Sequence, residues 1–439
     1  MRILHCADLH LGRRRLDGRL PDTDFAAALQ HIVARAVAWK AHAFLIAGDL
    51  FDTPQIPPPV LRQATAALAP LKKARIPVLA IEGNHDRPGF ANTQPTWVQY
   101  LGDEGLLTLL STPFNADGPL LTPYDAATQR GALLELDGVR FVGAGYLGAG
   151  TERKARAIAQ ALPEDGKPTV MLLHAGPEYF VGETGGFTKD TLTLLRARVT
   201  YLALGHIHKP MLHRDADGRP WAINPGAPEN CRLDESTVTE PRGWVELEIV
   251  PDALPGLALL DAHVLDCPRR PVLRVELNIA HFGNKLKDGE QAIAAAAVKA
   301  IQESHAPAEA VVRLFLMGEL NLGRIAVEPQ SLGAQIAQQA GVAGVEVNLE
   351  LLKLFTGRLM PARRGAGLTT AEIEKLALEE ILKERPAEGL EERTPEVVDF
   401  LRKLKELVAQ NAPPEAVLEL LETSPLPTEL ARELGQTLL

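Results

Sequence analysis

The sequence predicts an α/β fold in which strands and helices alternate along most of the chain. Five short, mostly apolar runs are each typical of a strand buried on both faces. Each run leads into an acidic, amide or imidazole side chain, usually beside a glycine, where the chain must turn sharply. Apolar residues recur every three to four positions over residues 25–39 and 60–74, which predicts helices there. Polar groups therefore collect at the carboxyl ends of strands, where open α/β sheets place their ligands.

The five runs contribute seven potential metal ligands. The segments are ILHCADLHLG, AFLIAGDLFD, VLAIEGNHD, VMLLHAG and YLALGHIHKP. The ligands, in chain order, are Asp8, His10, Asp49, Asn84, His174, His206 and His208. A single Asp or Asn after a strand is more often a turn former or a helix cap, and a single histidine is more often structural. The conjunction of all seven, in this order along one alternating chain, favours a metal site.

The residue types indicate hydrolysis of a phosphoester by two metal ions. Two divalent cations about 3.5–4 Å apart can clamp the attacking and leaving oxygens, and a carboxylate can bridge them and offset their repulsion. Imidazole and carboxylate ligands suit manganese, zinc or iron better than calcium. The neutral Asn84 oxygen keeps the positive field of the pair high, which lowers the pKa of a bound water. His85 lies outside the ligand set and can protonate the leaving oxygen or stabilise charge on the phosphorane.

The motifs DLH, GDLFD, GNHD, LLHAG and GHIH resemble those of the calcineurin-like metallophosphoesterases. Within this superfamily, MRILHCADLHLG, LIAGDLFDT, IPVLAIEGNHDRPG and the later INPGAPEN followed by LDE are similar to the SbcD-type nucleases. These are the bacterial counterparts of the nuclease subunit of the MRN double-strand-break repair complex. The resemblance is dense over roughly residues 1–235 and weak beyond. It implies a two-sheet α/β sandwich, a manganese-activated DNA nuclease and a homodimer.

The resemblance also implies a role for each ligand. The first metal would be held by Asp8, His10, Asp49 and His208, and the second by Asp49, Asn84, His174 and His206, with Asp49 bridging. His85 would be the catalytic histidine that holds no metal. Two positions depart from the family's pattern. Asp52 stands where archaeal and eukaryotic members tend to have a second histidine, and Ala227 stands where a serine is frequent, so no role is carried over to either.

Three regions are expected along the chain. Residues 1–268 would form the catalytic α/β region, which ends at proline-rich text around residues 251–271. Residues 271–360 would form a smaller α+β module that resembles the capping domain with which SbcD-type nucleases select DNA. Its strands are expected over 272–279, 310–320 and 345–355, and its helices over 290–304 and 330–339. Residues 366–439 would follow a basic linker as a helical tail.

The tail contains amphipathic helices whose packing partner the sequence leaves open. A Thr-Pro helix start at Thr394 precedes an apolar stripe over residues 397–408, and shorter helices are expected over 414–422 and 428–438. Thr369 and Glu372 also have capping-box spacing. The stripes pack on each other, on the parent domain or, by analogy with SbcD, on a coiled-coil ATPase of the SbcC type.

Charge and cysteine content are compatible with a DNA enzyme of the cytoplasm. The net charge of −10 comes mostly from residues 366–439, where 16 acidic residues face 8 basic ones; the preceding part carries 40 against 38. Cys6, Cys231 and Cys267 show no CxxC spacing, which argues against a disulfide framework. No apolar run approaches the roughly 18 residues of a membrane span, and the N-terminal residues do not resemble a secretory signal.

The sequence leaves the role of two sets of residues undecided. Arg13, Arg14, Arg15 and Arg19 follow the first ligand motif, and they would either contact the DNA backbone or remain solvated charges. The segments 60–74 and 94–101 are candidate contact helices of a dimer, although their apolar faces could equally belong to the core.

The sequence thus predicts an SbcD-type DNA nuclease that acts on DNA ends in double-strand-break repair or recombination, as an exonuclease or also an endonuclease. One alternative is a calcineurin-like phosphodiesterase for small nucleotides or other phosphoesters, against which the extra module and tail argue. The other is a non-catalytic repair adaptor, against which the complete ligand set argues.

Overall fold

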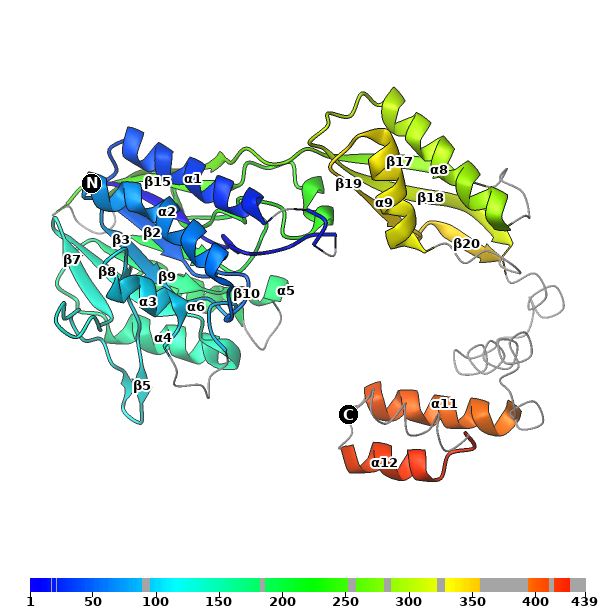
Figure 1. Cartoon of the computed structure of the whole chain (residues 1–439). Helices are drawn as coiled ribbons and strands as arrows, with labels where there is room; N and C mark the ends of the chain where they lie inside the picture. The colour runs from blue at the N-terminus through cyan, green and yellow to red at the C-terminus, as the bar shows by residue number, and fades with distance from the viewer. Residues whose placement is uncertain are drawn as a thin grey trace. The chain divides into compact units, whose positions relative to one another are not determined.

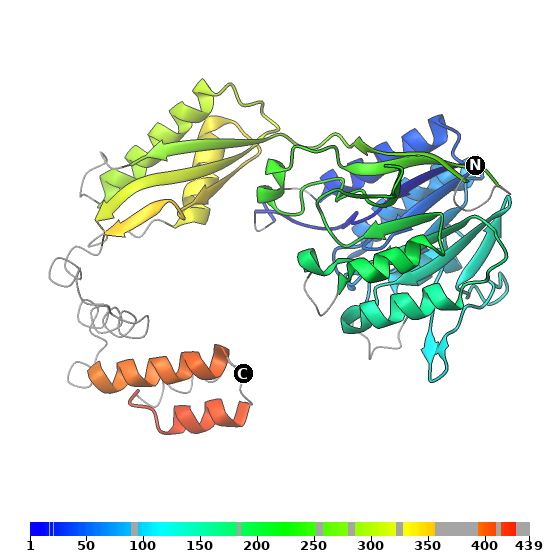
Figure 2. The same ribbon diagram turned by 180° about the vertical axis from the view of Figure 1, so that it is seen from behind.

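Figures 1 and 2 show the computed structural model of the chain from two sides. The structure describes residues 1–16, 18–20, 22–88, 95–181, 186–251, 258–279, 286–321, 328–355, 394–409 and 414–426. Two compact units are distinguished, one of Met1–Leu277, Gln291–Leu316 and Glu328–Glu350, the other of Asn278–Glu290, Met317–Val327 and Leu351–Leu439. The three regions expected from the sequence stay predictions. Among the described residues, no helix combines the length and apolarity needed to cross a membrane.

Two six-stranded sheets form the core of the N-terminal part. The first has the order β16-β15-β1-β2-β3-β4, with β1 (Arg2–Cys6), β2 (Ala43–Ala47), β3 (Val78–Ile81), β4 (Thr108–Leu109), β15 (Gly243–Ile249) and β16 (Leu259–Asp266). The second has the order β13-β14-β12-β9-β8-β7, with β7 (Leu133–Leu136), β8 (Val139–Gly145), β9 (Thr169–His174), β12 (Tyr201–Gly205), β13 (Met211–Arg214) and β14 (Pro220–Asn224). The strands β1 to β4 are parallel, as are β8, β9, β12 and β14, so their carboxyl ends lie together.

The two sheets pack face to face because alternate residues of each strand point to opposite sides. Along β2, Leu45 faces the core between the sheets, whereas Phe44 and Ile46 pack on the other side. Phe141 and Leu172 from the second sheet belong to the same inner core as Leu45. Both faces of the central strands are therefore buried, which explains their continuous apolar sequences.

Helices cover the outer faces of the two sheets (Figure 1). On the first sheet lie α1 (Thr23–Ala38) and α2 (Pro58–Ala74), which are the helices predicted over residues 25–39 and 60–74. On the second sheet lie α4 (Thr151–Ala161) and α6 (Lys189–Arg196). The layers are helix, sheet, sheet and helix, which confirms the predicted two-sheet α/β sandwich.

Short elements complete this part of the chain. They are α3 (Trp97–Asp103), β5 (Phe114–Asn115), β6 (Gly118–Pro119), η1 (Gly148–Gly150), β10 (Gly176–Pro177), α5 (Glu178–Val181), β11 (Gly186–Phe187) and η2 (Leu233–Thr237). Of the two candidate dimer helices, α2 buries Leu68 and Leu71 in the core of the first sheet, and α3 buries Val98 and Leu101 there. Gln94, at the start of the second candidate segment, lies outside the described residues. These buried faces are core.

The segment over residues 272–355 has a strand or a helix wherever the sequence predicts one. It comprises β17 (Val272–Asn278), α8 (Leu286–Glu303), β18 (Val311–Asn321), α9 (Pro329–Ala340), β19 (Gly344–Asn348) and β20 (Leu352–Phe355). The alternation over residues 345–355 is one strand in the prediction but two in the structure, both parallel to β18. The Asn348 side chain accepts a hydrogen bond of 2.9 Å from the Glu350 backbone N–H. This local turn interrupts the strand.

In the tail, α11 (Thr394–Ala409) and α12 (Pro414–Glu422) are the helices expected there. Phe400 and Leu404 of α11 pack against Val417 and Leu421 of α12. Each helix thus buries at least part of the apolar stripe of the other. The helix expected over 428–438 and the capping box at Thr369 lie outside the described residues.

Candidate metal centre

The seven predicted ligands meet where strands of both sheets end. Asp8 and His10 follow β1, Asp49 follows β2, Asn84 follows β3, His174 ends β9, and His206 and His208 follow β12. The side chains of Asp8, His10, Asp49 and His174 are buried. The sandwich therefore brings together groups that are up to 200 residues apart in the sequence.

Asp49 lies between two groups of ligands. Its Oδ2 is 3.2 Å from His174 Nε2 and 3.8 Å from His10 Nε2. Asn84 Oδ1 is 3.2 Å from His174 Nε2 and 2.9 Å from His206 Nδ1. Asp49 thus occupies the position that a bridging carboxylate needs.

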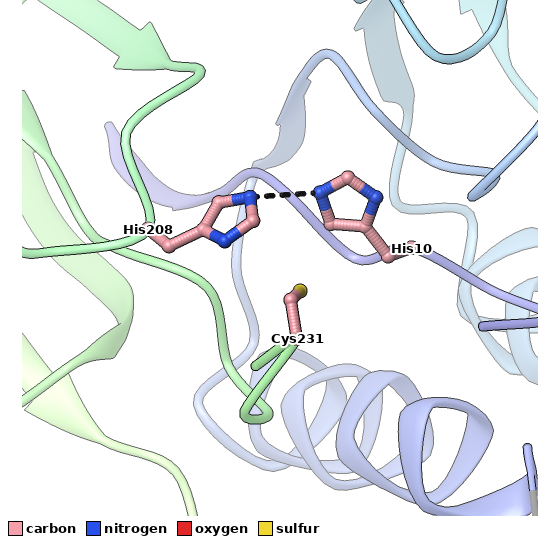
Figure 3. A group of neighbouring side chains, drawn as sticks. All are labelled: His10, His208 and Cys231. Carbon is pink, nitrogen blue, oxygen red and sulfur yellow. Dashed lines mark hydrogen bonds between the residues drawn. The ribbon is translucent and has the colours of Figure 1, made fainter. Parts of the chain in front are cut away.

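His10 and His208 form the other side of the site. Their Nε2 atoms are 3.1 Å apart (Figure 3). Asp8, His10 and Asp49 also offer ligand atoms that all lie within 4.8 Å of one another. The Asp8 carboxylate accepts hydrogen bonds of 2.9 and 3.1 Å from the His206 backbone N–H, which ties the end of β1 to the end of β12.

Four of the seven residues have left-handed backbone conformations. The φ angles of Asp8, His10, Asp49 and His206 are 54°, 42°, 52° and 90°. Such conformations are uncommon for residues with a side chain and cost on the order of 1–3 kcal/mol each. The packing of the two sheets therefore holds these residues against their local preference, as is frequent at functional sites.

Bonds to the second ring nitrogen orient the histidines. His174 Nδ1 donates to the Ala47 carbonyl at 2.8 Å, and His208 Nδ1 lies 2.7 Å from Glu235 Oε1. Each arrangement leaves Nε2 available as a metal donor. His10 Nδ1 is an exception, because it is buried and lies 3.3 Å from Asp52 Oδ1 without hydrogen-bond geometry.

The donor set fits two divalent cations. Imidazole nitrogens, carboxylates and an amide oxygen are the ligands that manganese, zinc and iron accept. Burial alone would lower the pKa of His174, but the Asp49 carboxylate raises it to about 9. Burial and the neighbouring His174 lower the pKa of His206 to about 3. The Asp49 carboxylate thus stabilises positive charge beside it, and a bound dication would supply that charge in place of a proton on His174.

Asp86 is a buried carboxylate that the sequence did not assign. It accepts hydrogen bonds from the backbone N–H groups of Phe51 at 2.9 Å and Gly83 at 2.8 Å. It therefore holds the loop after β2 against the loop after β3. Burial, together with the charge of Asp49, raises the pKa of Asp86 to about 7. GNHD contains this residue, but the motif does not show which backbone groups it binds.

Glu235 is a second unassigned anchor. Besides its contact with His208, it accepts a hydrogen bond of 2.8 Å from the Cys231 backbone N–H. The residue lies in the LDE motif that contributes to the family resemblance, but the motif does not indicate its role. A carboxylate that orients a ligand histidine is a common feature around metal ions.

The two departures from the family's pattern have different surroundings. Asp52 Oδ1 is 2.7 Å from Arg13 Nη1 and 3.3 Å from His10 Nδ1, so the carboxylate links an arginine to the ligand set. Ala227 is buried in the core on the first sheet.

The four arginines near the first motif do not share one environment. Arg15 is buried, and its guanidinium pairs with Asp24 and, at 3.0 Å, with Glu229. It has no surface to offer a DNA backbone, so the expectation of a DNA contact is corrected for this residue. Arg13 is half-buried and also donates to the Cys231 carbonyl at 2.8 Å. Arg14 and Arg19 are exposed, and Arg19 donates to the Gln330 carbonyl at 2.7 Å.

Residues 1–210 match the sequence profile of the calcineurin-like phosphoesterase family. With the sandwich fold and the converging ligands, this match shows that the N-terminal part of the chain is a calcineurin-like metallophosphoesterase domain. The predicted resemblance to the calcineurin-like metallophosphoesterases is confirmed for this part of the chain.

The relatives comprise DNA repair proteins and a component of a nuclease. DNA double-strand break repair protein Mre11 of Aeropyrum pernix is 28% identical over 294 residues, which cover 64% of this chain and 65% of that protein. Its namesake from Archaeoglobus fulgidus is 28% identical over 238 residues, with coverage of 54% and 52%. A subunit of the SbcCD nuclease of Bacillus subtilis is 25% identical over 305 residues, with coverage of 62% and 72%. The chain thus spans between half and two thirds of the two archaeal relatives.

The close packing around Asp49 predicts the effect of a single methyl group. A Cβ on Gly83 would lie 2.0 Å from Asp49 Oδ1. We expect Gly83→Ala to displace this carboxylate and to weaken Mn²⁺ binding by roughly 100-fold, since shifts of about 1 Å have effects of this size in functional sites. Isothermal titration calorimetry measures the affinity. Gly102→Ala is the matched control, because the nearest atoms to its Cβ would lie at 3.8 Å; equal affinities in the two variants would contradict the geometry.

Proposed function

We propose that this protein is a manganese-dependent DNA nuclease of the SbcD type, which hydrolyses phosphodiester bonds at DNA ends in double-strand-break repair or recombination. The convergence of the seven ligands around Asp49 carries this proposal. The names of the relatives, which describe double-strand break repair and a nuclease, support DNA as the substrate.

The side chains have distinct roles in the proposal. One metal is held by Asp8, His10, Asp49 and His208, and the other by Asp49, Asn84, His174 and His206. When bound, two such cations supply Lewis acidity and a nucleophile at neutral pH. The protein fixes part of the donor set before the substrate arrives, because Asp8, Asp49 and His174 are buried and hydrogen-bonded to backbone groups. Metal binding requires neutral imidazoles, so activity is expected to fall in mild acid.

His85 is the proposed proton donor to the leaving oxygen. Its backbone N–H donates to Asp49 Oδ1 at 2.9 Å, and its Nδ1 donates to the Asp52 carbonyl at 2.7 Å. These two bonds hold the residue beside the metal ligands, with the ring 4.9 Å from that of His10. Since Nδ1 is occupied, Nε2 is the atom that can reach a substrate.

His85→Gln separates turnover from metal binding. We expect the kcat for DNA hydrolysis to fall about 10²- to 10⁴-fold, the usual contribution of a general acid. Mn²⁺ affinity is expected to stay unchanged, because His85 holds no metal. Single-turnover kinetics and calorimetry give the two quantities. His263→Gln on β16 is the control, as its ring is exposed and pairs with Asp261. A fully active His85→Gln protein would rule out the proton-donor role.

The substrate class has a direct test. The full chain is incubated with Mn²⁺ and end-labelled duplex DNA, end-labelled single-stranded DNA, or bis-p-nitrophenyl phosphate. Cleavage of DNA is the expected result. Hydrolysis of the small ester alone would favour a small-substrate phosphodiesterase. Hydrolysis of none of the three would contradict an autonomous nuclease and favour either the adaptor or a nuclease that requires a partner protein.

We further propose that the enzyme works in the cytoplasm as a homodimer bound to a coiled-coil ATPase of the SbcC type. The Bacillus subtilis relative is named as one subunit of a nuclease, SbcCD, which supports an association with another protein. The pair of helices α11 and α12 is the proposed docking element. Its mutual packing leaves Leu418 of α12 45% exposed, so an apolar side chain remains for a partner.

Removing the tail tests the docking role. Deletion of residues 366–439 is expected to abolish co-purification with the ATPase and to leave Mn²⁺-dependent hydrolysis of bis-p-nitrophenyl phosphate intact, since the ligands lie in residues 8–208. Pull-down and a colorimetric assay measure the two effects. Loss of both would assign the tail a structural role instead.

A further inference from the structure

We propose that Cys231 is a metal ligand, and that His10, His208 and Cys231 form a site for Zn²⁺ at the edge of the two-metal centre. The inference rests on the proposed metal centre, because two of the three residues belong to it. It adds a thiolate to a donor set that otherwise contains only nitrogen and oxygen.

The three side chains are close enough to share one ion. One ligand atom of each lies within 4.8 Å of the others, and the two Nε2 atoms are 3.1 Å apart. In a tetrahedral zinc site, with Zn–N near 2.0–2.1 Å, two ligand nitrogens are about 3.3 Å apart. With Zn–S near 2.3 Å, the sulfur belongs about 3.5 Å from each nitrogen. The imidazoles already have the required spacing, and the sulfur, within 4.8 Å of each nitrogen instead of about 3.5 Å, needs a shift of about 1.3 Å at most.

The orientation of the thiol also fits. Figure 3 shows the Cys231 sulfur pointing toward the two rings. Cys231 is buried, and the hydrogen bond of its Sγ is a long contact of 4.0 Å to the Glu229 carbonyl. The thiol therefore loses only this weak hydrogen bond when its sulfur binds a metal.

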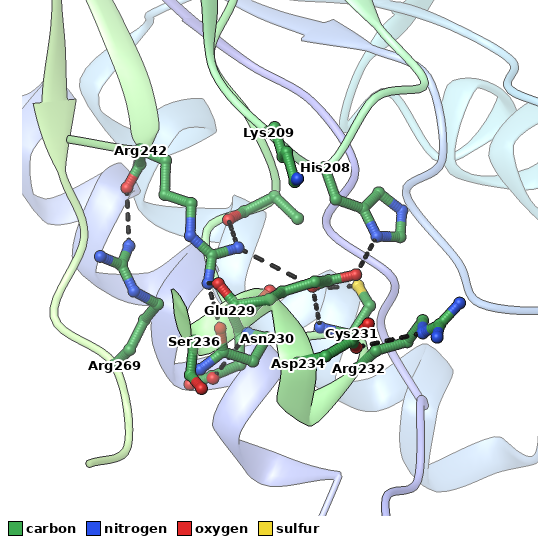
Figure 4. A network of polar contacts seen from close by, with 12 residues as sticks. His208, Lys209, Glu229, Asn230, Cys231, Arg232, Asp234, Ser236, Arg242 and Arg269 are labelled. Carbon is green, nitrogen blue, oxygen red and sulfur yellow. Dashed lines mark hydrogen bonds and ion pairs between the residues drawn. The ribbon is translucent and has the colours of Figure 1, made fainter. Parts of the chain in front are cut away.

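A second observation comes from Glu235, which holds two of the three ligands at once. Its Oε1 lies 2.7 Å from His208 Nδ1, and its Oε2 accepts the Cys231 backbone N–H at 2.8 Å. Figure 4 shows His208, Cys231 and Arg242 in this network of polar contacts. Arg242 Nη1 lies 3.8 Å from Oε2 and steadies the carboxylate. One side chain thus directs the lone pair of His208 and fixes the chain that carries the sulfur, in the manner of the outer ligands of zinc sites.

The chemistry of the donors selects the metal. A thiolate is a soft ligand that favours zinc, whereas oxygen-rich sites suit manganese. Zinc binding at His10, His208 and Cys231 releases the thiol proton to solvent. Because His10 and His208 are then engaged, the first manganese position loses two of its four proposed ligands. Zinc is therefore expected to inhibit the manganese enzyme.

Cobalt is the spectroscopic probe for this site, because Co²⁺ replaces Zn²⁺ and a Co²⁺–thiolate bond absorbs strongly in the near ultraviolet. We expect this charge-transfer band when Co²⁺ is titrated into the full chain, and its absence in Cys231→Ser and Cys231→Ala. Cys267→Ser is the matched control, since Cys267 is also buried and lies outside the metal-ligand groups found among the described residues. Circular dichroism and thermal unfolding show whether each variant is folded.

Competition between Zn²⁺ and Mn²⁺ gives a second readout. The Zn²⁺ affinity relative to that for Mn²⁺ should fall at least tenfold in Cys231→Ser, since loss of even an outer-shell partner costs about 10- to 100-fold. Visible cobalt bands without the thiolate band would overturn the role of Cys231 and leave the two-metal proposal standing. The absence of any cobalt absorption would overturn both.

Discussion

The fixed position of the Asp49 carboxylate is the constraint on which the rest of the site depends. Its Oδ1 accepts the His85 backbone N–H, and its Oδ2 lies 3.2 Å from His174 Nε2. The loops around it are packed so closely that a Cβ on Gly48 would lie 2.3 Å from His174 Nδ1. Glycine is required at positions 48 and 83, because a Cβ at either position would collide with the side chain of a candidate ligand, His174 or Asp49. The site exists only if the ends of β2, β3 and β9 meet, so it is a property of the whole sandwich.

The sandwich also has to hold conformations that the isolated loops would not adopt. A polar contact between the sheets helps, since His5 on β1 lies 3.0 Å from the Tyr201 hydroxyl and 3.1 Å from the Leu204 carbonyl on β12. Burial lowers the pKa of His5 to about 3, so the ring is neutral and its Nε2 donates to Leu204. This contact lies directly before Asp8 and His206, whose left-handed conformations are held by the same two strand ends.

The convergence of the candidate ligands could be predicted because each directly follows or ends an apolar strand, and that local pattern indicates where parallel strands end. The residues that hold the ligands and their loops in place could not be predicted from the local sequence pattern. Arg15 belongs to an ion pair with Glu229, which is 214 positions away, and the sequence alone gave it the same standing as the exposed Arg14. Asp86 binds the backbone of the loop after β2, and Glu235 binds the His208 side chain, so both act on partners that lie far away in the sequence. The division between β19 and β20 depends on one side-chain bond of Asn348 that alternation does not encode.

Strand β18 and the turn that carries Glu235, beside the candidate metal site, are linked through a short apolar cluster. Leu233, at the start of the turn that carries Glu235, is buried with Leu20 and Val311. Leu20 closes the loop of arginines after the first ligand motif, and Val311 begins β18 of the module. A displacement of β18 would therefore act on the same turn that orients His208 and supports Cys231. Glu235, which orients His208, is thus carried by a turn that packs on β18, whereas His174 is held by its bond to the Ala47 carbonyl at the end of β2.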